Sequence, residues 1–98
     1  MEINTQKEGK KVTFALDGKL DVLAAREFNN VVEAEIKDAD EVVFDFEKLT
    51  YIASAGLRVI LATQKIMNKK GTMVVRNVCP AVMDVLAVSH FTDFITIE

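Results

Sequence analysis

The chain has 98 residues, of which 50% are hydrophobic and 28% charged, and 12 Lys and Arg against 15 Asp and Glu give a formal charge of -3. This balance predicts one folded domain over residues 1–98 and argues against a disordered chain. The acidic charge disfavours a nucleic-acid binder, the apolar runs are too short to span a membrane, and the single cysteine excludes an internal disulfide.

The first third of the chain predicts two strands followed by a helix. Residues 12–16 place apolar side chains at every second position, as in a half-buried strand, and residues 3–6 predict a shorter edge strand before it. From residue 23 the apolar period becomes helical, and Asp21 stands at the position of an N-cap. One side of this helix collects its apolar residues, Ala25, Phe28, Val32 and Ile36.

The rest of the chain alternates strands with helices. The nearly continuous apolar run at residues 42–46 predicts a central strand covered on both faces. The segment 53–56 opens a second helix, which Lys69, Lys70 and Gly71 close. Three more elements are expected: a strand at 73–75, a helix that begins at Cys79-Pro80, and a short last strand at 94–97. Short connections between strands and helices require parallel neighbours, so the fold class is α/β with a mixed sheet.

The sequence contains few groups suited to catalysis. His90 is the only histidine, and Cys79 is better explained as a partly buried helix cap than as a nucleophile. Glu33 and Glu35 are about 200° apart around a helix, so they do not form an acid and base pair. The glycines are isolated and form no phosphate-binding loop. We therefore expect no enzyme, no catalytic residue, no cofactor and no metal.

Ser54 is the one position that invites a functional interpretation. It lies between a strand and a helix, beside Ala53 and Ala55 and before Gly56, so little bulk covers its hydroxyl. Spacing alone favours an N-cap serine. A serine at a helix start is also a good phosphoacceptor, because the added dianion meets free amides and the positive end of the helix dipole.

The run from Val42 to Leu61 resembles the signature of STAS domains, specifically of bacterial anti-sigma factor antagonists. In that family a hydrophobic strand and an acidic, leucine-containing turn lead into Asp-Ser-(Ser, Thr or Ala)-Gly-Leu and a helix. Residues 18–21, 71–75 and 80–82 are similar to other parts of the family, so the resemblance covers nearly the whole chain. It implies a STAS-like mixed central sheet of four to five strands packed by about three to four helices.

The resemblance implies a cytoplasmic partner switch. Unphosphorylated members of the family bind a serine kinase of the GHKL type that doubles as an anti-sigma factor, and so free a sigma factor. Phosphorylation of the motif serine breaks this complex, and a PP2C-type serine phosphatase restores it. No direct contact with nucleic acid and no membrane insertion are implied.

Matched to the family motif, the phosphoacceptor is Ser54. The implied partner-binding residues are Asp21, Ala53, Ala55, Gly56, Leu57 and Arg58. The missing side chain of Gly56 is expected to let a partner backbone approach closely. The chain departs from the motif at Ala53, where the family commonly has Asp. The alternative is therefore a non-phosphorylated STAS adaptor or scaffold subunit, for example of a membrane-transport complex, in which Ser54 only caps a helix.

Overall fold

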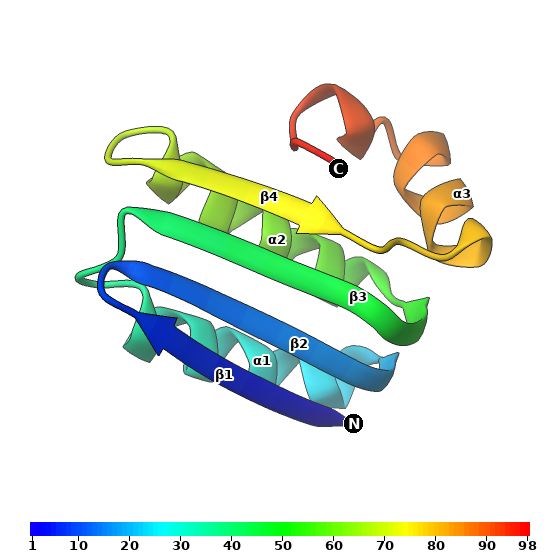
Figure 1. The fold of residues 1–98 in the computed structure, drawn as a ribbon. Helices are drawn as coiled ribbons and strands as arrows, with labels where there is room; N and C mark the ends of the chain where they lie inside the picture. The colour runs from blue at the N-terminus through cyan, green and yellow to red at the C-terminus, as the bar shows by residue number, and fades with distance from the viewer.

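The computed structural model describes residues 1–98. Its four strands form one sheet in the order β1-β2-β3-β4 (Figure 1). The strands are β1 (Glu2–Glu8), β2 (Lys11–Leu20), β3 (Glu41–Ile52) and β4 (Thr72–Arg76). β1 pairs antiparallel with β2, and the pairs β2–β3 and β3–β4 are parallel. The predicted mixed sheet and the central place of β3 are therefore confirmed.

The helices are α1 (Val22–Glu35), α2 (Ser54–Met67) and α3 (Pro80–Val88), and a 3-10 turn, η1 (Phe91–Asp93), follows α3. The connections from β2 to β3 and from β3 to β4 run through α1 and α2, which lie on the same face of the sheet (Figure 1). α3 begins with Pro80 at its first position and with Cys79 as its N-cap, as predicted. No helix has the length and apolar character needed to cross a membrane.

The core lies between the sheet and the two long helices. The predicted apolar side of α1 is buried, with Phe28 fully inaccessible. Its ring packs edge-on against Phe44 of β3 at a centroid distance of 5.5 Å, and Phe14 of β2 stacks on Phe44 at the same distance. Burial of each such ring contributes about 1.5 to 3 kcal/mol. These contacts hold α1 against β2 and β3.

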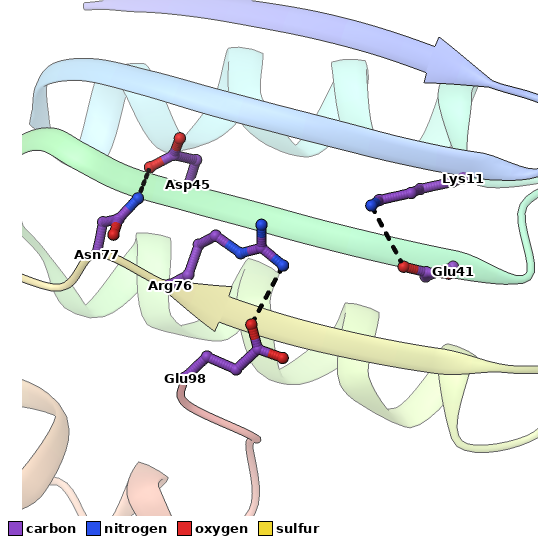
Figure 2. A network of polar contacts seen from close by, with 6 residues as sticks. All are labelled: Lys11, Glu41, Asp45, Arg76, Asn77 and Glu98. Carbon is purple, nitrogen blue, oxygen red and sulfur yellow. Dashed lines mark hydrogen bonds and ion pairs between the residues drawn. The ribbon is translucent and has the colours of Figure 1, made fainter.

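The expectation that β3 is covered on both faces is wrong, because both long helices pack on one face. The other face carries polar pairs (Figure 2). There the ammonium of Lys11 lies 3.7 Å from a carboxylate oxygen of Glu41, and the guanidinium of Arg76 lies 3.1 Å from Glu98. Val43 is nevertheless only 1% exposed. It lies between Thr13 of β2 and Val74 of β4 in the middle of the sheet.

The expected last strand is reduced to a single bridge, in which Ile97 pairs in parallel with Val75 of β4. The amide of Val75 donates to the carbonyl of Thr96 at 2.9 Å, and the amide of Glu98 donates to the carbonyl of Val75 at 2.8 Å. The turn η1 occupies residues 91–93, so too few residues remain in extended conformation to form a ladder. The prediction of a strand at 94–97 is therefore wrong in extent.

Candidate functional site

The starts of α1 and α2 lie next to each other at one edge of the sheet. β2 ends at Leu20 and β3 ends at Ile52, and these two residues are partners in the parallel ladder. The amide of Ala53 donates to the carbonyl of Leu20 at 2.9 Å, which ties the two strand ends together. The residues that follow, Asp21 and Ser54, therefore enter neighbouring helices from adjacent points of the sheet.

Ser54 is the first residue of α2 and is exposed. The N-cap is Ala53, whose extended backbone (φ -91°, ψ 166°) provides no side-chain cap, so the interpretation of Ser54 as a capping serine is wrong. The amides of Gly56 and Leu57 both donate to the carbonyl of Ala53, at 2.9 and 3.1 Å. The hydroxyl of Ser54 makes no hydrogen bond within the chain.

Asp21 is the N-cap of α1, as predicted. Its Oδ1 accepts a hydrogen bond from the amide of Ala24 at 2.8 Å, and its backbone is extended. Asp21 is exposed, so its carboxylate is both a structural cap and a charge at the edge where Ser54 lies. The first turn of α2 has no corresponding acidic residue or side-chain cap.

Gly56 and Leu57 do not belong to the exposed surface, which corrects their expected contact with a partner. Both are buried in α2, and Leu57 is only 5% exposed. A Cβ added at Gly56 would lie 2.6 Å from Cδ2 of Leu20, well inside normal contact distance. The glycine is needed because α2 crosses the end of β2 at close range, and its small size serves packing inside the domain.

Three exposed hydrophobic residues at this edge are absent from the predicted site. Val22 is 64% exposed, Leu23 is 76% exposed and Tyr51 is 49% exposed. Leu23 could have been found from the sequence, since it stands outside the apolar side of α1 that begins at Ala25. Exposed apolar patches with a polar rim mark interaction surfaces. We define the Ser54 surface as the exposed and half-buried residues at the starts of α1 and α2 and at the adjoining end of β3, which are Val22, Leu23, Tyr51, Ala53, Ser54, Ala55 and Arg58.

The other groups considered for chemistry lie outside the Ser54 surface. Cys79 lies at the start of α3, and its thiol donates a long hydrogen bond of 3.5 Å to the carbonyl of Leu49 in β3. His90 is exposed and holds a left-handed backbone (φ 60°) before η1. A cavity of about 270 Å³ lies along β1, β2 and β3, and its lining, which includes Asp17 and Asp45, contains no residue of the Ser54 surface. The structure contains no cluster of three acidic, histidine or cysteine residues arranged to hold a metal ion.

A comparison with protein families matches residues 3–96 to the family described as "Mlab, STAS domain". The chain belongs to the STAS domain family. The match covers all four strands except Glu2, the first residue of β1, and includes the Ser54 surface. Among proteins of curated function, none matches the sequence of this STAS domain.

Solved structures share the fold of this STAS domain. The Bacillus cell fate determinant SpoIIAA in its phosphorylated form aligns with a TM-score of 0.78 and 18% identity, over 99% of this chain and 91% of that one. An anti-sigma factor antagonist from Mycobacterium paratuberculosis aligns with a TM-score of 0.90 and 16% identity, over 99% and 84% of the two chains. An anti-sigma-factor antagonist (STAS) domain protein from Planctomyces limnophilus aligns with a TM-score of 0.86 and 16% identity, over 98% and 87%. At these identities the likeness establishes a common fold.

Proposed function

We infer that this STAS domain is a cytoplasmic anti-sigma factor antagonist, which binds a serine kinase of the GHKL type and is released when Ser54 is phosphorylated. The observation that carries this proposal is the free, exposed hydroxyl of Ser54 at the first residue of α2. The membership of the STAS family and the fold shared with anti-sigma factor antagonists support it. In this function the chain is a docking module and the partner is the enzyme.

The exposed apolar residues beside Ser54 supply binding energy for such a partner. Full burial of one leucine or valine side chain contributes about 1.5 to 3 kcal/mol. Leu23 and Val22 are more than half exposed in the free chain, so a partner that covers them gains most of that amount. A micromolar complex requires about 8 kcal/mol in total. Two or three such anchors therefore form the centre of an interface around the hydroxyl.

Phosphorylation transfers one phosphoryl group from the ATP bound by the kinase. The Oγ of Ser54 attacks the γ-phosphorus, a new O–P bond forms, the bond to the β,γ-bridging oxygen breaks, and ADP leaves. The hydroxyl proton passes to a base of the kinase. A PP2C-type phosphatase reverses the modification by hydrolysis, which consumes water and releases inorganic phosphate.

The phosphate breaks the complex by electrostatics and desolvation. It adds a charge of about -1.5 to -2 at pH 7. An anion left unpaired in a buried interface costs several kcal/mol, and each 1.4 kcal/mol lowers the affinity about tenfold. No change of fold is required, since Ser54 is already outside the core.

The test compares charge at Ser54 with the same charge elsewhere. Ser89 is the only other serine and is exposed at the end of α3, so Ser89→Asp is a matched control for Ser54→Asp. By calorimetry with the kinase partner, Ser54→Ala and Ser89→Asp should bind like the unmodified chain. Ser54→Asp should bind at least about tenfold more weakly. Equal affinities of the two Asp variants would refute the proposed switch.

The second candidate is a STAS adaptor or scaffold that is never phosphorylated, for example in a membrane-transport complex. The observation that favours it is Ala53, which stands where an acidic residue commonly precedes the serine in anti-sigma factor antagonists. Affinity capture from native lysate, with and without ATP, separates the two functions when bait and prey are both analysed by mass spectrometry. The switch predicts a kinase among the prey and the mass of one phosphoryl group on Ser54. The adaptor predicts transport subunits and no modification.

A further inference from the structure

Arg58 is an exposed cation without a partner on the Ser54 surface. The three ion pairs of the chain are Lys7–Glu35, Lys11–Glu41 and Arg76–Glu98. Arg58 takes part in none of them, and its side chain makes no hydrogen bond within the chain. By contrast, Arg76, the arginine on β4, is paired. The side chain of Arg58 is therefore available to pair with an anion that is added to the chain later, such as a phosphate.

The position of Arg58 relative to Ser54 fits such an anion. Both residues belong to α2 and are exposed, and they are four positions apart. Residues at this spacing lie on one face of a helix, with Cβ atoms about 5 to 6 Å apart. An anion that precedes a cation by four residues is in the favourable order for an ion pair. The planar guanidinium also matches phosphate oxygens, with two N–H groups that donate in parallel.

We propose that Arg58 is the internal partner of phosphoserine 54 and that phosphorylation withdraws this arginine from the docking surface. The inference rests on the proposed function, because it assumes that Ser54 is modified. The unmodified chain presents a free guanidinium on the Ser54 surface, which also includes the exposed apolar residues Val22 and Leu23. The modified chain presents an ion pair held on α2. One phosphoryl group thereby adds a charge to the surface and also removes a cation that a partner uses.

Other charged groups at this edge do not replace Arg58 in the role. Asp21 is the carboxylate at the adjoining start of α1, and its Oδ1 is engaged by the amide of Ala24. Lys19, at the end of β2, and Arg26, in the second turn of α1, are exposed cations on elements other than α2. Lys65 is on α2 but stands eleven positions after Ser54, which corresponds to about 16 Å along the helix axis. That distance exceeds the Debye length of about 8 Å at physiological ionic strength.

The experiment measures ionisation of the phosphate in the full chain. Phosphoserine is installed at position 54 during translation, so that no kinase is needed, and the second pKa of the phosphate is followed by phosphorus NMR. This pKa is about 6 in free phosphoserine, and a neighbouring cation lowers it because it favours the dianion. Arg58→Gln should raise the pKa by about 0.2 to 0.4 relative to the unsubstituted chain.

Control variants distinguish a direct ion pair between Arg58 and phosphoserine 54 from a general electrostatic effect of the other cations. Lys65→Gln and Lys19→Gln remove the same charge elsewhere and should change the pKa by less than about 0.1. Arg58→Lys keeps the charge and should recover at least half of the difference. An unchanged pKa in Arg58→Gln, an equal rise in Lys65→Gln or Lys19→Gln, or no recovery in Arg58→Lys would each overturn the assignment.

The inference rests on the proposed function, but the phosphate pKa can be measured whether or not Ser54 is modified in cells. If Ser54 is never modified in cells, the proposed function fails, although the pairing is still measured on the installed phosphoserine. If the Ser54→Asp variant loses its kinase partner while the phosphate pKa is insensitive to Arg58, the switch stands and this inference alone fails. The two results therefore identify which of the two statements is wrong.

Discussion

Replacing Gly56 with alanine tests how closely α2 is packed on the end of β2. The new Cβ would lie 2.6 Å from Cδ2 and 2.7 Å from Cγ of Leu20, and 3.2 Å from Cγ1 of Ile52. Leu20 is fully buried, so its side chain has no free space into which to turn. Overpacking of this kind costs about 1 to 3 kcal/mol. Alanine also favours a helix interior over glycine by about 1 kcal/mol, which offsets part of that cost.

We therefore expect Gly56→Ala to lower the free energy of unfolding by up to about 2 kcal/mol. Urea-induced unfolding followed by circular dichroism measures this value. Ala62→Gly is the matched control, because Ala62 is exposed on the same helix and its replacement reports helix propensity alone. A Gly56→Ala chain that is about 1 kcal/mol more stable than the unsubstituted one, which is the full gain in helix propensity, would show that α2 moves away from β2 without cost.

The double variant Leu20→Ala with Gly56→Ala tests whether position 56 packs directly on Leu20. Leu20→Ala alone leaves a cavity and should cost about 2 to 5 kcal/mol. In the presence of Gly56→Ala, the same truncation removes the clash and the new methyl group fills part of the cavity. The two changes should therefore be less destabilising together than their sum by at least about 1 kcal/mol. Simple additivity would mean that Gly56 does not pack on Leu20 in the way described.

Three further predictions concern stability, and urea unfolding measures each. Gly71→Ala should cost at least about 3 kcal/mol, because the new Cβ would lie only 1.8 Å from the backbone carbonyl oxygen of Asp40; a smaller loss would show that this turn adjusts easily. Asp21→Ala should cost about 1 kcal/mol by removing the N-cap of α1, while Asp21→Asn should restore most of it; equal losses would exclude a capping role. Lys70→Met should cost about 1 to 2 kcal/mol, because the ammonium donates hydrogen bonds to the carbonyls of Ile36 and Lys37 after α1; an unchanged stability would mean that water replaces it fully.

The elements of the fold that could be predicted are those with a local pattern. The apolar side of α1 follows from the spacing of Ala25, Phe28 and Val32, and each of them is buried. Asp21 and Pro80 mark the starts of α1 and α3 because an N-cap and a first-turn proline depend only on neighbouring backbone groups. The motif around Ser54 likewise placed the candidate hydroxyl at the start of α2.

The amino-acid order by itself therefore determined the type and order of the elements from β1 to α3 and the location of the exposed serine, since these depend on residues within a turn or two of each other. Tertiary contacts decided the rest. Gly56 is needed for packing because Leu20, 36 positions earlier, lies beneath it. Val22 and Leu23 remain exposed because no element of the sheet or of α2 covers the first turn of α1. Such contacts join residues distant in the chain, and no local period of hydrophobic residues encodes them.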